Sequence, residues 1–523
     1  MKCPGTPGDP PALNANRIPV TVPAFDNSYA RLPERFYARV DPLRPPAPSL
    51  IALNRDLASE LGFDPDWLAS QEGLDFLTGR AVAPGSEPIA TAYAGHQFGN
   101  FVPQLGDGRA ILLGEIVNTH GQRRDIQLKG SGRTPFSRGG DGRAALGPVL
   151  REYLVSEAMA ALHIPTTRSL AASATGDSVR REAELPGAVL VRVASSHIRV
   201  GTFQFLAARQ DFEGIRLLAD HVIARHYPDA CGAEQPYRAL LEHVVIAQAD
   251  LIARWMLVGF IHGVMNTDNM SVAGETIDYG PCAFLDAYDP ATVFSSIDHG
   301  GRYAFGKQPE IALWNLARLA ETLLPLLSDD QKESVTIATN ILGTFPILYH
   351  QHSLHGQRAK LGLRDPGDAN PDADSVDSAL AADWLTLLQA QQVDYTLAWR
   401  RLGDAAAGDE APLRALFADS DAPDTWLARW HARCADESTS DGAAVVVASQ
   451  RAKAMNRVNP IIIPRNHRVE EALAAASGAG DLLPFERLLA ALRNPCEETA
   501  EGAAYAEPAA AAVTACYRTF CGT

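Results

Sequence analysis

The hydrophobic pattern of this chain changes once, near Thr202, and that change limits the fold more than any other feature. Before it, short apolar stretches and glycine-rich turns predict strands around a single long helix. After it, apolar residues recur at helical spacing through most of the sequence. Because strands and helices are grouped and do not alternate, the pattern predicts an α+β fold with a strand-rich half and a helical half, not a series of βαβ units.

The individual elements follow from the same periodicities. Strands are predicted at residues 109–116, 125–129, 167–172 and 188–193, with one helix at 147–163. Residues 50–61 are predicted to form a helix with Ser49 as its N-cap. Later helices are predicted at 203–226, 237–260, 309–326 and 330–342, with a short strand at 275–278. Residues 364–380 and 402–424, which are acidic and rich in Pro, Gly and Ala, are predicted to be loops or linkers.

Charge and composition exclude several classes of function. The 523 residues contain 46 Lys and Arg against 62 Asp and Glu, a net charge of −16. We therefore expect no nucleic acid and no membrane as a partner of the whole surface, while a local basic groove stays possible. The most membrane-like stretch, 251–265, is too short to span and contains Arg254 and His262. With no signal-like apolar start and seven cysteines outside CxxC pairs, we expect a cytoplasmic protein.

Residues 261–280 carry the most specific chemical signal in the chain. They read Ile-His-Gly-Val-Met-Asn-Thr-Asp-Asn-Met-Ser-Val-Ala-Gly-Glu-Thr-Ile-Asp-Tyr-Gly. The amide oxygen of Asn269 and the carboxylate of Asp278 can converge on one hard cation, and magnesium prefers such oxygen ligands. Asp268 could accept the proton of an attacking hydroxyl. The string resembles the catalytic loop and metal-binding strand of kinases, but Val264 stands where they place their base.

Lys129 lies in a predicted apolar strand of a chain that uses few lysines. In kinases a strand lysine contacts the phosphates and pairs with a glutamate of the following helix. The helix at 147–163 offers Glu152 and Glu157. Helical periodicity places Glu157 on the apolar face and Glu152 away from it, so periodicity alone favours Glu157.

A glycine-rich loop, residues 130–142, follows Lys129, whereas kinases place theirs before the lysine strand. Glycines let backbone N–H groups approach phosphates. Arginines at 133, 138 and 143 add positive charge to the loop. Arg192 and Arg199 follow the next strand and could clamp a phosphate.

Several strings together resemble the selenoprotein O family of pseudokinase-fold protein adenylyltransferases. They occur in family order and cover most of the chain: Tyr93-Ala-Gly-His-Gln-Phe-Gly99, Gln104-Leu-Gly-Asp-Gly-Arg109, Leu128-Lys-Gly-Ser-Gly-Arg-Thr-Pro135, Arg192-Val-Ala-Ser-Ser-His-Ile-Arg199, His262-Gly-Val-Met-Asn-Thr-Asp-Asn269 and Ile277-Asp-Tyr-Gly-Pro281. The resemblance implies a protein-kinase-like two-lobed fold that binds ATP in a flipped orientation. It implies transfer of AMP to Ser, Thr or Tyr hydroxyls of proteins, with release of pyrophosphate.

The resemblance also implies roles for single residues. It makes Asp268 the proton acceptor and Asn269 and Asp278 the ligands of Mg²⁺, with Mn²⁺ as an alternative. It pairs Lys129 with Glu152, against the choice that periodicity favours. The positions implied to contact the nucleotide are Gly106, Gly108, Arg109, Lys129, Asp141, Gly142, Arg192, Arg199 and Asp278.

The implied organisation has four parts. Residues 1–90 form an N-terminal extension packed on the core, 91–201 a nucleotide-binding N-lobe, 202–480 a helical C-lobe and 481–523 a C-terminal tail. Many family members have a selenocysteine or cysteine near the C-terminus, and Cys521 stands at such a place in the tail, which also contains Cys516. The cysteine that could bond to it in those members corresponds to Phe294, which makes a disulfide switch through Cys282 a weaker hypothesis.

Two other functions stay open from the sequence. The chain could be a kinase that transfers the γ-phosphate, as Asn269 and Asp278 suggest, although Val264 argues against it. It could also be a pseudokinase that binds nucleotide without turnover. Magnesium and manganese accept the same ligands and are not distinguished.

Overall fold

An antiparallel sheet forms the first half of the chain in the computed structural model, which describes residues 22–365, 373–437 and 444–520. The strand order is β1-β3-β6-β7-β10-β9-β2, and β8 pairs with β10. The strands are β1 (Tyr37–Arg39), β2 (Ser49–Leu53), β3 (Ile89–Thr91), β6 (Ala110–Val117), β7 (Arg123–Lys129), β8 (Ala144–Ala145), β9 (Arg168–Arg180) and β10 (Glu184–Ala194). Lys129 lies opposite Ala110 on one side and Leu190 on the other.

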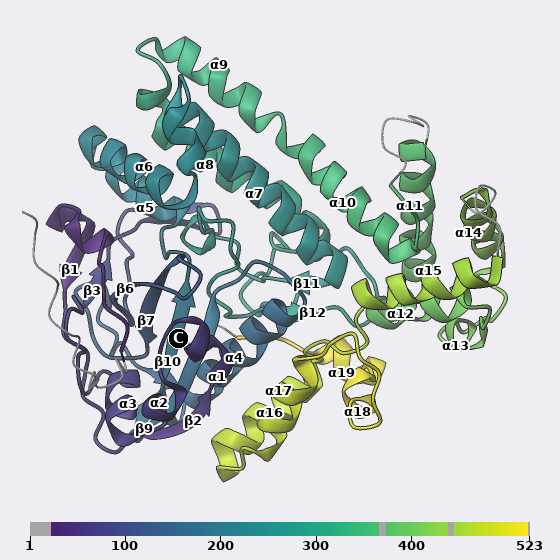
Figure 1. Ribbon diagram of the computed structural model, residues 1–523, viewed down its shortest axis with the longest axis horizontal. Helices are drawn as coiled ribbons and strands as arrows, with labels where there is room; N and C mark the ends of the chain where they lie inside the picture. Colours follow the sequence, from purple (N-terminus) through teal and green to yellow (C-terminus); the bar gives the residue numbers. More distant parts are fainter. Residues whose placement is uncertain (1–21, 366–372, 438–443, 521–523) are drawn as a thin grey trace, which may run out of the picture.

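Helices cover both faces of this sheet (Figure 1). On one face, α1 (Arg55–Glu60), α2 (Pro65–Leu68) and α3 (Gln71–Leu77) pack on Ile126 and Leu128 of β7. On the other face lies α4 (Leu146–Ala161), which packs on β9 and β10. Because side chains alternate along a strand, Gln127 and Lys129 face the α4 side.

The helical half follows the sheet along the chain (Figure 1). Its elements are α5 (Val200–Ala207), α6 (Phe212–His226), α7 (Pro236–Val258), α8 (Gln308–Leu327), α9 (Gln331–Leu342) and α10 (Phe345–Leu361). They bury one large apolar cluster, which includes Leu241, Ile252 and Leu316. Helix α10 packs along α7. The chain from α7 to α8 holds the short antiparallel pair β11 (Phe260–Ile261) and β12 (Ala283–Phe284).

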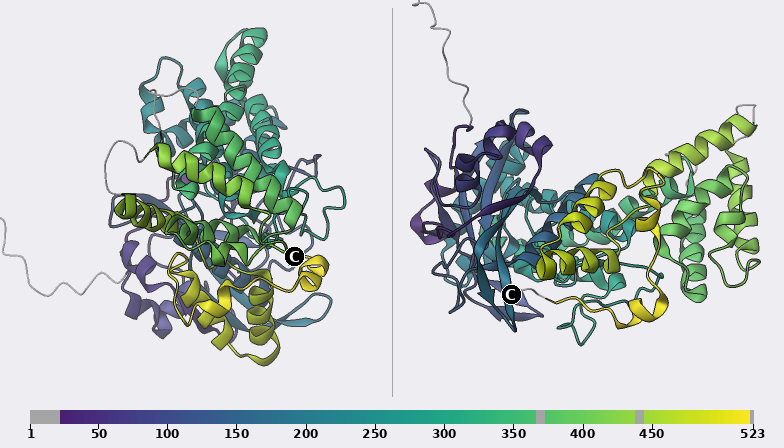
Figure 2. Two further views of the ribbon diagram at one scale, coloured as in Figure 1. Left: turned by 90° about the vertical axis from the view of Figure 1, so that its right-hand side faces the viewer. Right: turned by 90° about the horizontal axis from the view of Figure 1, so that it is seen from below.

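A second group of helices lies at the end of the molecule away from the sheet (Figure 2). It comprises α11 (Ala373–Gln391), α12 (Tyr395–Ala406), α13 (Ala411–Arg414), α14 (Asp424–Asp436) and α15 (Ala444–Val458). Its core is aromatic, with Trp384 buried against Trp399 and Trp426. We call this group the outer helices.

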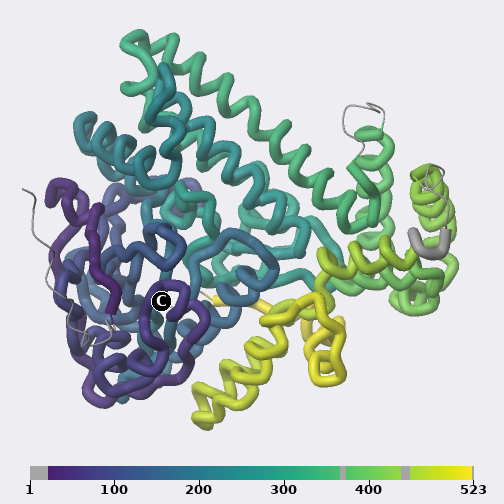
Figure 3. The backbone as a smooth tube through the Cα atoms, in the orientation of Figure 1, coloured from purple at the N-terminus to yellow at the C-terminus, as the bar shows by residue number. Residues whose placement is uncertain are grey.

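The last helices return to the sheet half (Figure 3). They are α16 (Asn466–Ala479), α17 (Leu483–Leu492), α18 (Ala503–Ala506) and α19 (Ala511–Cys516). Helices α16 and α17 pack on α4, which they hold against the sheet. Beyond α19, Thr519 Oγ1 donates to the carbonyl oxygen of Pro281 at 2.7 Å.

The structure confirms an antiparallel sheet followed by a helical region and corrects several predicted elements. Residues 50–61 are not one helix, because Leu50 to Leu53 pair with β9 as a strand. The helix starts at Arg55, and Asn54, not Ser49, is its N-cap. The predicted helix 203–226 is broken into α5 and α6, where Gln210 has φ 55° and Asp211 caps α6.

Three other predictions are corrected. Residues 275–278 contain no strand, only an isolated bridge between Thr276 and Thr166. Within 364–380, residues 366–372 lie outside the described part, and α11 begins at Ala373. Within 402–424, α12 continues to Ala406 and α13 follows. Alanine favours helix, and the apolar faces of α11 and α12 are buried against the tryptophans, so these segments fold as helices.

Only some of the cysteines named in the sequence analysis lie in the described part of the chain. Cys521 lies outside the described residues, while Cys516 is exposed and Cys282 is buried. Phe294 is buried against the ring of Tyr517. Among the described residues, no helix combines the length and apolar character needed to cross a membrane.

One buried arginine joins the outer helices to the final ones. Arg465, at the start of α16, is fully buried, and its Nη1 lies 2.8 Å from Asp286 Oδ1 and 2.7 Å from Asp394 Oδ2. Asp394 is the N-cap of α12. Removing the guanidinium would leave two buried carboxylates without their cation.

We therefore predict that Arg465→Met lowers the free energy of unfolding by about 3–5 kcal/mol, measured by urea denaturation. The matched control is Arg487→Ala on the exposed face of α17, which should stay within about 0.5 kcal/mol of the parent. Equal stability of the two variants would contradict the interpretation.

Candidate active site

A cavity of about 750 Å³ lies where the sheet meets the helical half. Its walls come from β6, β7 and β10, from the glycine-rich loop after Lys129, and from residues 264–281. It brings together almost all residues singled out in the sequence: Gly106, Gly108, Arg109, Lys129, Asp141, Gly142, Arg192, Arg199, Asp268, Asn269 and Asp278. Glu152 does not line the cavity, but its carboxylate forms an ion pair with Lys129, which does.

Lys129 lies between two carboxylates. Its Nζ is 2.5 Å from Glu152 Oε2 and 3.4 Å from Asp278 Oδ1. Glu152 is almost fully buried, and it also receives Arg192 Nη1 at 3.3 Å. Burial lowers the pKa of Lys129, and Glu152 opposes that shift.

The structure separates the two candidate glutamates of α4. Glu157, which periodicity favoured, pairs with Arg168 at 2.8 Å and with the amide of Asn54 at 2.7 Å. It points toward the first residues of β9 and the N-cap of α1, away from Lys129. The apolar stripe was misleading because α4 is buried on nearly all sides, between the sheet and α16 and α17, so both glutamates are enclosed.

Asp278 is held by cations from three elements. Arg192 Nη1 lies 2.5 Å from Oδ1, and Arg199 Nη1 lies 2.6 Å from Oδ2. Burial opposes its charge, but Arg199, Arg192 and Lys129 hold its pKa well below the usual range. Its backbone has φ 60°, a conformation that non-glycine residues seldom adopt. The contacts of the carboxylate therefore hold this residue in a strained backbone conformation.

Asp268 has a different environment from Asp278. It is 7% exposed, and among the described residues Oδ1 has no hydrogen-bond partner, while Oδ2 receives a long bond of 3.4 Å from Gln97 Nε2. Burial raises the pKa of Asp268 to about 6. A carboxylate with a free oxygen and a pKa close to neutrality is suited to accept a proton.

A small hairpin that the sequence analysis did not assign holds the loop around Asp268. It consists of β4 (Gly95–Gln97) and β5 (Asn100–Val102). The backbone N–H of His96 donates to Thr267 Oγ1 at 2.7 Å, and that of Phe98 donates to Asn266 Oδ1 at 3.1 Å. The ring of His96 contacts Gln204 and Trp314, so this histidine is packed.

Gly95 is needed at the hairpin because of Asp268. A Cβ atom at this position would lie 2.3 Å from Asp268 Oδ1. Any side chain would displace the carboxylate or the hairpin. The two glycines in Tyr93-Ala-Gly-His-Gln-Phe-Gly99 were the signal that could have identified this contact.

Two oxygen donors are placed to hold a divalent cation. The Nδ2 of Asn269 donates to the carbonyl of Val264 at 2.9 Å, which leaves its amide oxygen as the free donor, and both Asn269 and Asp278 line the cavity. Among the described residues, no group of three His, Cys, Asp or Glu side chains forms a complete metal site. Two ligands completed by water and phosphate fit magnesium, which is seldom enclosed by protein alone.

The cavity is cationic in an acidic chain. Its lining has eight Arg and Lys side chains against four Asp, while the whole chain carries −16. Asp141, on the rim, pairs with Arg181 at 2.9 Å. A Cβ at Gly142 would lie 2.0 Å from the carbonyl oxygen of Gly132, so the glycine-rich loop can fold back only with glycine there. This lining suits a polyphosphate.

Comparison with known proteins shows the family of this chain. The family model described as protein adenylyltransferase SelO matches residues 19–493. A relative from Rhodopseudomonas palustris (strain HaA2), named protein nucleotidyltransferase YdiU, is 60% identical over 501 residues, 95% of this chain and 99% of the relative. A relative of the same name from Methylorubrum populi is 60% identical over 508 residues, again 95% and 99% of the two chains. The chain belongs to the SelO family of protein adenylyltransferases.

Proposed function

We propose that this protein transfers AMP from ATP to the hydroxyl groups of Ser, Thr or Tyr residues in other proteins and releases pyrophosphate. Family membership supports adenylyl transfer with ATP as the donor. At the level of residues, the proposal rests on one observation: the same cationic cavity contains two carboxylates with opposite pKa shifts. Asp268 has a raised pKa and a free oxygen, and Asp278 has a depressed pKa and three cations.

We assign the fold to the protein-kinase-like two-lobed class. The cavity between a strand-rich half and a helical half supports this assignment, as does a strand lysine paired with a helix glutamate. The corresponding domains are an extension at 1–90, an N-lobe at 91–201, a C-lobe at 202–480 and a tail at 481–523. The glycine-rich, basic loop that follows Lys129 supports a nucleotide flipped relative to kinases.

In the proposed mechanism, Asp268 takes the proton of the substrate hydroxyl as its oxygen attacks the α-phosphorus. The new bond joins that oxygen to the α-phosphorus, and the bond from the α-phosphorus to the oxygen bridging to the β-phosphate breaks. Lys129, Arg192 and Arg199 offset the charge of the phosphates and of the leaving pyrophosphate. Gly106, Gly108, Arg109, Asp141 and Gly142 line the remaining contact surface for the nucleotide.

Asn269 and Asp278 would hold the divalent cation, magnesium or manganese. When bound, it would draw charge from the phosphate oxygens. Without the cation, the carboxylate of Asp278 is already neutralised by Arg192 and Arg199. The chain therefore keeps this carboxylate ionised and oriented before the metal and nucleotide enter.

The first test uses ATP labelled separately at the α- and γ-phosphates, with purified protein, a divalent metal and a cell lysate as acceptor. We expect label to reach protein from the α-position only. Transfer from the γ-position only would identify a kinase and refute the mechanism. Nucleotide binding without transfer from either position would favour a pseudokinase that acts by binding.

The raised pKa of Asp268 predicts a pH dependence. Because the carboxylate must be ionised to accept a proton, kcat/KM for MgATP should be constant above about pH 7 and fall about tenfold per unit well below pH 6. Asp268→Asn, which keeps the shape but cannot take the proton, should lose about 10²-fold or more of the rate. A flat profile between pH 5 and pH 7 in the parent protein would argue against Asp268 as the acceptor.

Removing the carboxylate of Asp278 should also abolish adenylyl transfer, here through loss of the metal ion and not of the proton acceptor. Asp278→Ala removes a proposed metal ligand and takes away the carboxylate that both Arg192 and Arg199 contact. We expect adenylyl transfer to become undetectable, with the metal dependence of ATP binding lost in calorimetry. The control is Asp329→Ala, an exposed aspartate between α8 and α9, which should behave as the parent. Full activity of Asp278→Ala would refute the assignment.

A further inference from the structure

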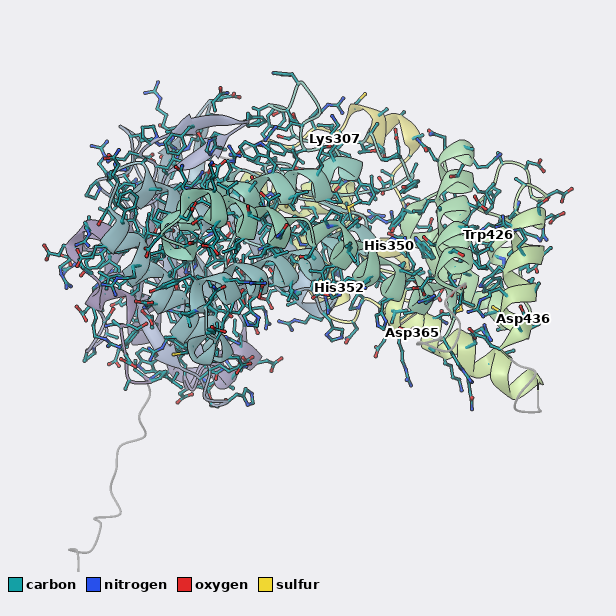
Figure 4. All side chains as sticks on the ribbon, turned by 90° about the horizontal axis from the view of Figure 1, so that it is seen from above. Lys307, His350, His352, Asp365, Trp426 and Asp436 are labelled. Carbon is teal, nitrogen blue, oxygen red and sulfur yellow. The ribbon has the colours of Figure 1, made fainter. Side chains whose placement is uncertain are left out.

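A second large cavity lies on another part of the molecule and has no part in the proposed reaction. Its volume is about 1030 Å³, and it shares no lining residue with the cavity around Lys129 and Asp278. Its walls come from the end of α4, from α7, α10 and α15, and from residues 493–497. Figure 4 labels His352, one of its lining residues, between the main body and the outer helices.

This second cavity is also cationic. Five Arg and Lys side chains line it against two carboxylates, Asp250 and Glu497. Asp250 already pairs with Arg254 at 2.8 Å. Within the described part of the chain, no carboxylate forms an ion pair with the remaining cations, which are Lys360, Lys453, Arg457 and Arg493.

Lys360 is the unusual member of this set. It is only 4% exposed, although a buried ammonium is costly without a counter-charge. Within the described residues its ammonium lies over the ring of Trp399, whose centroid is 5.0 Å from Nζ, and it interacts electrostatically with the thiol of Cys496. Burial lowers the pKa of Lys360 to about 7. A buried cation that lines a cavity and lacks a carboxylate is a position that an anion from outside can complete.

The walls between the cations are apolar. Leu257 and Val258 of α7 contribute on one side, and Pro460 and Pro495 on the other. Lys453, Arg457 and Arg493 are exposed at the rim, whereas Lys360 lies deep. The cavity volume is that of a small-molecule site, where apolar walls and a few polar groups share the recognition.

We propose that this cavity binds an amphipathic organic anion, a small molecule with a phosphate or carboxylate head and an apolar body. The head would lie against Lys360 and the rim arginines, and the body against the apolar walls. An acidic peptide is disfavoured because the deep part of the cavity offers one ammonium, not a row of cations. The proposal is independent of adenylyl transfer, since the two cavities have separate linings.

The test is calorimetric titration of the full-length protein with hexyl phosphate, inorganic phosphate and 1-hexanol. We expect hexyl phosphate to bind about tenfold or more tightly than either of the other probes, because only it offers both charge and apolar surface. Binding should persist with saturating α,β-methylene ATP, which occupies the other cavity and cannot release pyrophosphate. Displacement by that analogue, or equal affinity for all three probes, would overturn the proposal.

Three variants locate the site. Lys360→Met, which keeps length without charge, and Arg457→Ala at the exposed rim should each weaken hexyl phosphate by about tenfold. Arg487→Ala, an arginine outside the cavity, should not change the affinity. If Lys360→Met does not fold, Arg457→Ala still tests the site, because Arg457 is exposed and its replacement should not disturb the fold. Unchanged affinity in Arg457→Ala, or tighter binding of a tetraglutamate peptide than of hexyl phosphate, would refute the assignment.

Discussion

The buried charge cluster around Asp278 is the interaction on which the rest of the site depends. It joins β7 through Lys129, β10 through Arg192 and the start of α5 through Arg199. Glu152 ties α4 to the same cluster. Charges removed from water are tolerated only when each has a partner in good geometry. The sheet, α4 and the helical half therefore have one relative arrangement in which all these charges are satisfied at once.

The region around Asp268 follows the opposite rule. Here Oδ1 is left without a partner, and the hairpin of β4 and β5 holds the surrounding backbone through His96 and Phe98. The loop is thus fixed mainly by backbone hydrogen bonds to Asn266 and Thr267, while the carboxylate itself receives the long bond from Gln97 Nε2. Burial raises the pKa of a carboxyl group, and hydrogen bonds to its ionised form would lower it again. The pKa of Asp268 therefore stays raised because the loop is held through neighbouring residues and one carboxylate oxygen receives no hydrogen bond from the described residues. Gly95 makes this possible because it adds no atoms beside the carboxylate.

The sequence predicted the features that depend on local periodicity. Alternation along residues 125–129 placed Lys129 in a strand, and the residues 261–280 contained the three polar side chains that the cavity brings together. Helical periodicity gave the wrong glutamate where a helix is buried on more than one face. Helix α4 is enclosed by the sheet and by α16 and α17, so its apolar stripe could not distinguish Glu152 from Glu157.

Long-range contacts were the other limit. Residues 50–53 have an apolar pattern compatible with a helix, and only pairing with β9 makes them a strand. The hairpin contact to Thr267 joins residues 171 positions apart, so no local signal connects His96 to Asp268. Residues 402–424 were predicted as loops from their acidic composition, rich in Pro, Gly and Ala. They form helices because their apolar faces pack in the tryptophan-rich core of the outer helices, which local composition does not show. The family resemblance supplied Glu152, which the residues alone did not.

The contrast between a cationic cavity and an acidic chain has a consequence for which polyanions can reach the site. At physiological ionic strength, electrostatic fields around a protein decay over about 8 Å, so an approaching molecule responds mainly to the charges nearest to it. A free nucleotide is small enough to enter the cavity, where its phosphates would be surrounded by arginines. A nucleic acid strand carries the same phosphates, but most of them would remain outside, beside a chain with an excess of acidic groups. We therefore expect size and charge together to favour monomeric nucleotides over the polymers in which they also occur.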